Sequence, residues 1–242
     1  MIKYVLLLFL FSHFSFASPP VEIVYRCDRT PPSKVKAQGG FYPLGGNYRD
    51  RNYPPPNVSL WNHARDKEKE EKLNSGYVAT TSSYDFALRW CGIFGESYVY
   101  RIRATRAFIN VNRSLGDYSP HPDEDEYAAL GFIPWDQIIG WHIVVRGQPG
   151  FFQYNEDHSV VFYAGMSPAS SGNPRLAGFP VNHPAWSEEP WISFTNCRNQ
   201  HNWHKKSSDE CHPKKSAQAY GEEYFWDTYR QINGRMLLNN VL

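Results

Sequence analysis

The sequence lacks the short motifs that identify several common enzyme classes. It contains no GxGxxG fingerprint, no P-loop, no HExxH and no GxSxG, so it gives no support for a Rossmann fold, a P-loop NTPase, an HExxH zinc protease or an α/β-hydrolase. Its formal net charge is only +1, which argues against nucleic acid or an anionic membrane surface as a partner. No CxxC pair occurs, so a metal site is disfavoured.

Long apolar runs are also scarce, and the one that exists stands at the N-terminus. Lys3 precedes an apolar stretch over residues 5–16, and Ala17 is suited to cleavage before Ser18. This pattern predicts a secretory signal peptide over residues 1–17, because the run is too short and wrongly flanked for a transmembrane helix. The alternative is a buried N-terminal strand. No later stretch is apolar enough to cross a bilayer.

Cysteine is limited to four residues: Cys27, Cys91, Cys197 and Cys211. An even number in an exported protein indicates disulfide bonds. Four cysteines allow three pairings, and their spacing does not choose among them.

Aromatic residues are abundant at 16%, alongside 18 prolines and 17 glycines, a composition that suits short strands joined by turns. Alternation of apolar and polar residues predicts strands at residues 21–28, 76–81, 97–105 and 140–146. A helix is predicted to begin near Ser82 or Ser83, both good N-caps. Residues 39–56 and 151–190 read as loop. Aromatic residues three to five apart predict a C-terminal helix over residues 217–238.

Three separated segments carry groups suited to chemistry on NAD: an arginine at the end of the first strand (25–28), a hydroxyl-rich bend (76–83) and an acid-rich segment (119–127). Cleaving the nicotinamide bond of NAD leaves positive charge on the ribose, which a carboxylate can stabilise. A second carboxylate two residues away lies on the same side of an extended segment and could orient a nucleophile. An arginine can hold the phosphates through two hydrogen bonds.

The sequences of these segments and their order resemble those of the A subunit of cholera toxin and the related heat-labile enterotoxins, a family of bacterial ADP-ribosyltransferases. The matching motifs are YRxD at 25–28, HAR at 63–65, GYV at 76–78, YSPHPDE at 118–124, ALG at 129–131, IIGW at 138–141, LAGFP at 176–180 and EEPWI at 188–192. The resemblance implies an α+β fold with two small, mostly antiparallel sheets around an NAD cleft, and a C-terminal helical tail.

The resemblance also assigns roles to individual residues. Glu126 would be the catalytic glutamate at the NAD ribose, and Glu124 would prepare the acceptor. The residues on the NAD side would be Arg26, Asp28, His63, Thr80 and Thr81. The family's Ser-Thr-Ser reads Ala79-Thr80-Thr81 here, so one hydroxyl is missing and the two threonines are expected to support the glutamate. NAD would be a substrate, and no metal is implied.

A domain layout follows from the same resemblance. The signal peptide would precede a catalytic domain over 18–198, a protease-sensitive loop over 199–211 and a C-terminal helix over 212–242. A Cys197–Cys211 disulfide would close the loop, which leaves Cys27 and Cys91 for a second bridge that the family does not predict.

The implied biology is that of a secreted toxin subunit, exported through the periplasm and acting inside a host cell. Its C-terminal helix would dock a pentameric receptor-binding B subunit. Its acceptor would be an arginine of a heterotrimeric G protein α subunit, with a host small GTPase as activator. The alternatives are an NAD glycohydrolase, a pertussis-like transferase with a different acceptor, and a catalytically impaired subunit that acts as a binding module.

Overall fold

The computed structural model describes residues 19–45, 56–65, 74–93, 95–199 and 211–239. The predicted signal peptide, the charged segment 66–73 and most of the predicted cleavage loop lie outside these ranges. Among the described residues, no helix is long and apolar enough to cross a membrane.

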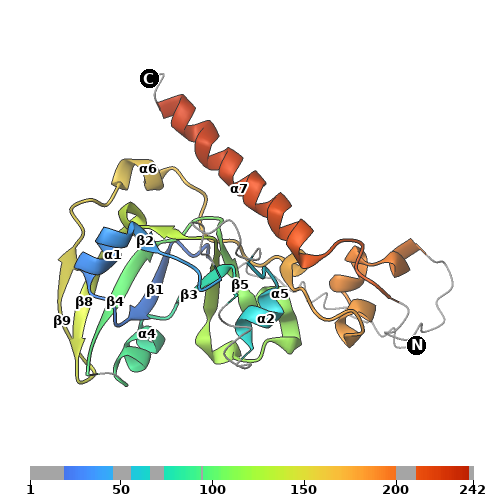
Figure 1. The fold of residues 1–242 in the computed structure, drawn as a ribbon, viewed down its shortest axis with the longest axis horizontal. Helices are drawn as coiled ribbons and strands as arrows, with labels where there is room; N and C mark the ends of the chain where they lie inside the picture. The colour runs from blue at the N-terminus through green and yellow to red at the C-terminus, as the bar shows by residue number, and fades with distance from the viewer. Residues whose placement is uncertain (1–18, 46–55, 66–73, 94, 200–210, 240–242) are drawn as a thin grey trace, which may run out of the picture.

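The centre of the fold is a seven-stranded antiparallel sheet with the order β5-β6-β3-β1-β4-β8-β9 (Figure 1). Its strands are β1 (Ile23–Asp28), β3 (Tyr77–Thr81), β4 (Glu96–Arg103), β5 (Phe108–Asn110), β6 (Glu126–Leu130), β8 (Ile138–Val145) and β9 (Gln148–Tyr154). A second sheet pairs β2 (Gly40–Phe41) with β7 (Ile133–Pro134).

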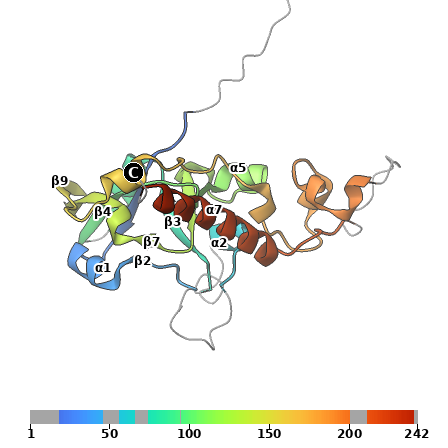
Figure 2. The same ribbon diagram turned by 90° about the horizontal axis from the view of Figure 1, so that it is seen from above.

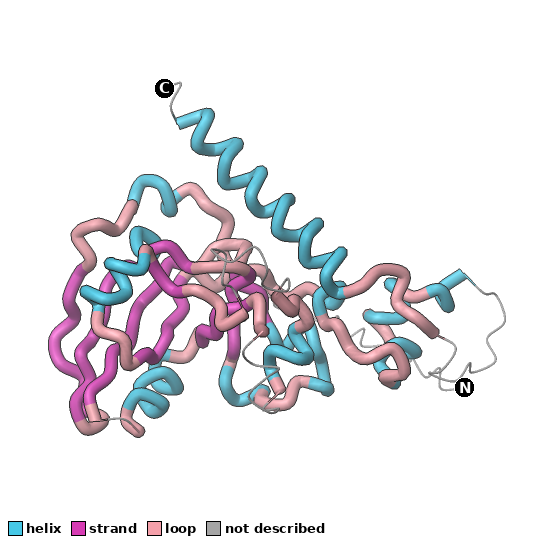
Figure 3. Tube along the Cα trace, viewed as in Figure 1, coloured by secondary structure: helices cyan, strands magenta, loops and turns pink. Residues whose placement is uncertain are grey.

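Most of the helices are short, and Figure 3 shows the strands gathered in one half of the molecule. The α-helices are α1 (Pro32–Gln38), α2 (Leu60–Ala64), α4 (Tyr84–Cys91), α5 (Val111–Leu115), α6 (Val160–Ala164) and α7 (Ala217–Asn239). The 3-10 helices are η1 (Gly116–Tyr118), η2 (Pro122–Glu124), η3 (Trp135–Gln137), η4 (Pro174–Leu176), η5 (Pro184–Ser187), η6 (Trp191–Phe194) and η7 (Asn196–Asn199).

The α+β class and the antiparallel pairing are as predicted, but only one of the two sheets is small, because the other has seven strands. β1 pairs with β4 along its whole length, whereas β1 and β3 share only the pair Tyr25↔Thr81. Beyond that pair the two strands diverge, and Nη1 of Arg26 donates to the Ala79 carbonyl at 2.8 Å where the main chains no longer pair. The Tyr25↔Thr81 pair between β1 and β3 therefore joins the two parts of the seven-stranded sheet into one.

The four predicted strands and the helix near Ser83 are confirmed. The Ser83 hydroxyl accepts the Phe86 N–H at 3.1 Å and so caps α4 as expected. Helix α6 and the second half of strand β9 were missed in the segment 151–190, which was predicted to be mainly loop. β9 lies at the sheet edge with most of its residues exposed on both faces, so it lacks the alternation by which a half-buried strand is recognised.

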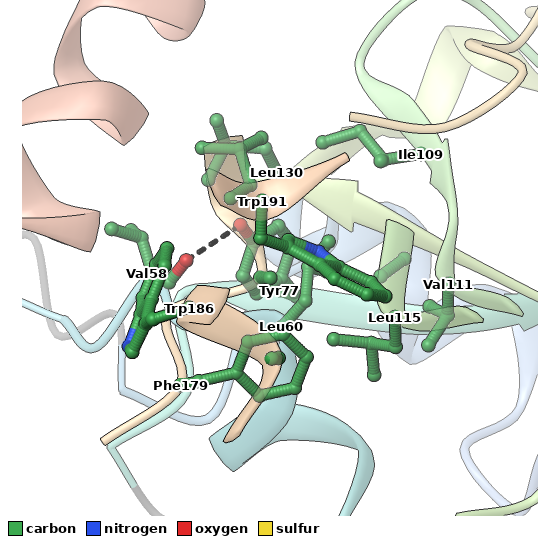
Figure 4. Close-up of a cluster of buried hydrophobic side chains, with 14 of the residues drawn as sticks. Val58, Leu60, Tyr77, Ile109, Val111, Leu115, Leu130, Phe179, Trp186 and Trp191 are labelled. Atoms are coloured by element: carbon green, nitrogen blue, oxygen red, sulfur yellow. Dashed lines mark hydrogen bonds between the residues drawn. The ribbon is translucent and has the colours of Figure 1, made fainter. Parts of the chain in front are cut away.

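A cluster of buried side chains supports the side of the sheet next to α2 (Figure 4). Leu60 of α2 is fully buried there, beside Tyr77 of β3 and Trp191. The Tyr77 hydroxyl donates to the Val58 carbonyl at 2.8 Å, so the one polar atom of this ring is satisfied inside the core. The cluster holds α2 and β3 in a fixed relation, and both elements contribute to the site described below.

The predicted C-terminal helix is confirmed as α7. Its first half packs on the body: the Tyr224 hydroxyl donates to the Arg106 carbonyl at 2.6 Å, and a Cβ added to Gly221 would lie 2.6 Å from Cγ2 of Val58. That close approach explains a glycine inside a helix, where it otherwise costs stability. The C-terminal end of α7 stands clear of the sheet in Figure 1, and Figure 2 gives the view from above.

The structure contains two disulfides. Cys27 of β1 is bonded to Cys91 at the end of α4, and Cys197 is bonded to Cys211. The first bond fixes α4 against β1, and the second closes the segment in which the cleavage loop is predicted.

Candidate active site

A cleft of about 320 Å³ opens beside the point where β1 and β3 diverge, and α4 forms one of its walls. Six of the predicted site residues line it: Arg26, His63, Thr80, Thr81, Glu124 and Glu126. The seventh, Asp28, is bonded to Arg26. Residues from four distant parts of the sequence are therefore brought together.

Arg26 is fixed by its neighbours. Its Nε and Nη2 donate to Oδ2 of Asp28 at 3.1 and 2.7 Å, and its Nη1 donates to the Ala79 carbonyl. Burial raises the pKa of Asp28, but the Arg26 charge and the Thr30 N–H outweigh it and leave that pKa below its usual value. Within the described part of the chain, two of the five guanidinium N–H groups stay available to a ligand.

Glu126 begins strand β6 and is only 8% exposed. Nε2 of His63 lies 2.9 Å from its Oε1, and Nδ1 of the same ring lies 2.7 Å from the Ser75 hydroxyl. The position of His63 follows from α2, whose Ser59 N-cap accepts the Asn62 N–H at 3.1 Å. A histidine in the cleft was expected, whereas its direct contact with the glutamate was not.

The two threonines do not reach the Glu126 carboxylate. The Thr80 hydroxyl donates to the Tyr127 carbonyl, and the Thr81 hydroxyl donates to the Glu124 carbonyl at 2.7 Å. In the β3–β6 ladder Thr81 pairs directly with Glu126. Their hydroxyls therefore secure the main chain on both sides of Glu126, and the contact to its carboxylate comes from His63.

The backbone between Glu124 and Glu126 is not extended, contrary to the prediction, although Glu124 still lines the cleft. It ends η2, and Asp125 then adopts a left-handed conformation with φ 46° before β6 begins. Aspartate tolerates this conformation better than most residues, and the Ser82 N–H donates to its carbonyl at 3.1 Å. Both carboxylates line the cleft, but a turn separates them.

Sequence reasoning missed several residues of the cleft, among them Ser75, Phe86 and Trp90. Ser75 contacts His63, and Phe86 and Trp90 of α4 present nearly parallel rings 6.3 Å apart. The four-residue spacing of the two aromatics on a predicted helix was an available signal. Ser75 had none, because it lies outside regular structure. Among the described residues, no group of three potential metal ligands gathers.

Comparison with known proteins identifies the family of this chain. The sequence model of the heat-labile enterotoxin alpha chain family matches residues 2–240. The chain is 37% identical over 201 residues to the A chain of heat-labile enterotoxin IIA of Escherichia coli, covering 80% of this chain and 76% of that one. It is 38% identical over 206 residues to the A chain of cholera enterotoxin of Vibrio cholerae, covering 79% and 77%.

Two further similarities bear on activity and fold. A Vibrio cholerae protein named NAD(+)–arginine ADP-ribosyltransferase Chelt is 37% identical over 177 residues, which cover 70% of this chain and 30% of that protein. A solved heat-labile enterotoxin double mutant superposes with a TM-score of 0.68 at 31% identity, over 90% of this chain and 96% of that one. The chain belongs to the heat-labile enterotoxin alpha chain family.

Proposed function

We propose that this chain transfers ADP-ribose from NAD to an arginine side chain of another protein. The observation that carries the proposal is the meeting of Arg26 and Glu126 in one cleft, with Glu126 buried and held by His63. A protein that is 37% identical to this chain, over 70% of the chain, is named NAD(+)–arginine ADP-ribosyltransferase Chelt.

The cleft supplies the groups that the reaction needs. The available N–H groups of Arg26 bind the NAD pyrophosphate. As the bond between ribose C1′ and nicotinamide breaks, nicotinamide leaves with the bonding electrons and positive charge develops on the ribose. The Glu126 carboxylate stabilises that charge. A guanidinium nitrogen of the acceptor then bonds to C1′ and loses a proton, and Glu124 orients this nucleophile.

The missing hydroxyl at Ala79 does not leave Glu126 without support. His63 holds its carboxylate and the two threonines hold its main chain. This argues for an active enzyme rather than an impaired one. Retention of Glu124 beside Glu126 favours an arginine acceptor over NAD hydrolysis alone.

We further propose that the chain is the secreted catalytic component of a two-component toxin. The relatives are named as the A components of enterotoxins, and the free-standing end of α7 suits a tail that docks a pentameric B subunit (Figure 1). The acceptor proposed from the family is a host G protein α subunit, with a small GTPase as activator.

Nicotinamide release, measured with and without an arginine-rich peptide, tests the activity. Transfer predicts that release accelerates with the peptide and that the peptide gains one ADP-ribose for each nicotinamide released. Release that ignores the peptide would identify a glycohydrolase. Release in neither condition would identify a binding module or an inactive protein.

A further inference from the structure

The Ser75 hydroxyl is buried next to the catalytic cleft. Ser75 is 6% exposed, and its side-chain oxygen makes two contacts: it lies 2.7 Å from Nδ1 of His63, and it accepts the Tyr77 N–H at 3.2 Å. The His63 side chain is 9% exposed, with its other nitrogen against Glu126. Four groups thus form a continuous hydrogen-bonded chain from the start of β3 to the carboxylate.

The direction of these bonds can be worked out from the donors. A carboxylate only accepts, so Nε2 of His63 must carry a hydrogen toward Glu126. In the neutral ring Nδ1 then holds a lone pair and requires a donor, which the Ser75 hydroxyl provides. In the opposite tautomer, a bare Nε2 would face the carboxylate and repel it. In the doubly protonated ring, the Ser75 hydrogen would have no acceptor among the contacts described.

We propose that Ser75 is a positioning residue that holds neutral His63 as the Nε2–H tautomer, and so aims the Glu126 carboxylate for the transfer reaction. The inference rests on the proposed function. With Oε1 engaged by His63, Oε2 is left for the ribose, since no described side chain shares a hydrogen bond with it. Ser75 therefore acts on the reaction through His63.

The direct test is spectroscopic and does not depend on activity. Nitrogen-15 spectra of the protein labelled at histidine distinguish the two tautomers, and His63→Gln assigns the signal. At neutral pH we expect His63 to carry its hydrogen on Nε2, and Ser75→Ala to change the signal toward a mixture of tautomers. A wild-type ring with its hydrogen on Nδ1, or on both nitrogens, would overturn the proposal.

Kinetics give the second test. We expect Ser75→Ala to lower kcat for nicotinamide release about tenfold, the loss of one buried hydrogen bond, with KM for NAD within about twofold. Ser75→Thr keeps the hydroxyl and should restore most of kcat. The matched control is Ser114→Ala, which removes an equally buried hydroxyl bonded to the Asn110 carbonyl and the Asn173 N–H, away from the cleft.

Two results would contradict the positioning role: an unchanged kcat in Ser75→Ala, or an equal loss in the Ser114→Ala control. Failure of the proposed function gives a different pattern. Either the arginine peptide would leave nicotinamide release unchanged in wild type, or no protein, wild type included, would release nicotinamide. In both cases the histidine spectrum would still report whether Ser75 sets the tautomer.

Discussion

The Cys27–Cys91 disulfide offers a quantitative prediction. It joins residues 64 apart in sequence and fixes α4 to the strand that carries Arg26. The chain-entropy model gives about 4 kcal/mol of stabilisation for a loop of this length. Replacing both cysteines by alanine should therefore lower Tm by roughly 8–16 °C, at about 2–4 °C for each kcal/mol in a protein of this size. Alanine is the suitable replacement because Cys91 is fully buried.

The same change should alter the cleft. Phe86, Ala87 and Trp90 line it from α4, so freeing α4 should raise KM for NAD more than it lowers kcat. Thermal unfolding followed by circular dichroism, with NAD kinetics at 25 °C, measures both effects.

The second disulfide provides the matched control, because Cys197 and Cys211 are only 14 apart in sequence and the chain-entropy relation assigns them about 3 kcal/mol. The Cys27–Cys91 variant should melt lower than the Cys197–Cys211 variant by a few degrees. A Tm within about 2 °C of wild type, or a smaller shift than in the control, would refute the loop-entropy reasoning.

Three further predictions concern the cleft. Glu124→Gln should lose transfer to an arginine peptide yet keep NAD hydrolysis; equal loss of both activities would show that the two glutamates do not divide the work. Ala79→Ser should not lower transfer, since the side chain at this position is exposed; a large drop would mean that the bend is packed differently. The lowered pKa of Asp28 means that its charge stabilises the fold above about pH 4 and that this contribution is lost as pH falls through the folded value. Asp28→Asn should therefore cost more stability at pH 7 than at pH 2, and urea unfolding at both pH values checks this.

Local patterns in the sequence predicted the elements whose residues carry a clear signal. Strand β1 and helix α4 were expected because one alternates and the other has a serine cap. The C-terminal helix was expected from its aromatic spacing, although Gly221 weakened the pattern, and its contact with Val58 explains why that glycine stands there.

Other features depend on contacts that no local pattern records. The large sheet is continuous through the single pair Tyr25↔Thr81, and this pairing depends on where β1 and β3 diverge in space. The turn at Asp125 replaces an extended segment because its carbonyl is held from another part of the chain. The spacing of the four cysteines did not choose among three pairings, and only the family resemblance left Cys27 with Cys91. The fold brings their Cα atoms within 5.4 Å of each other.

The sequence predicted the main residues of the candidate site, but it did not predict all of the hydrogen bonds that these residues make. The family resemblance led to Arg26 and Glu126, and the structure brings both to one cleft. The threonines were expected at the glutamate itself, but their hydroxyls bond to main-chain carbonyls on either side of it. Only the three-dimensional arrangement reveals that His63 contacts the Glu126 carboxylate and that Ser75 contacts His63.

The most direct test of the central claim is mass spectrometry of an arginine peptide incubated with NAD and either wild type or Glu126→Gln. Wild type should add ADP-ribose to arginine. Glu126→Gln should retain less than about 1% of that transfer, the scale expected when a preorganised charge at the reacting centre is removed. Glu156→Gln, an exposed glutamate outside the cleft, should match wild type. Transfer by a folded Glu126→Gln variant at more than a few per cent of the wild-type rate would contradict the account.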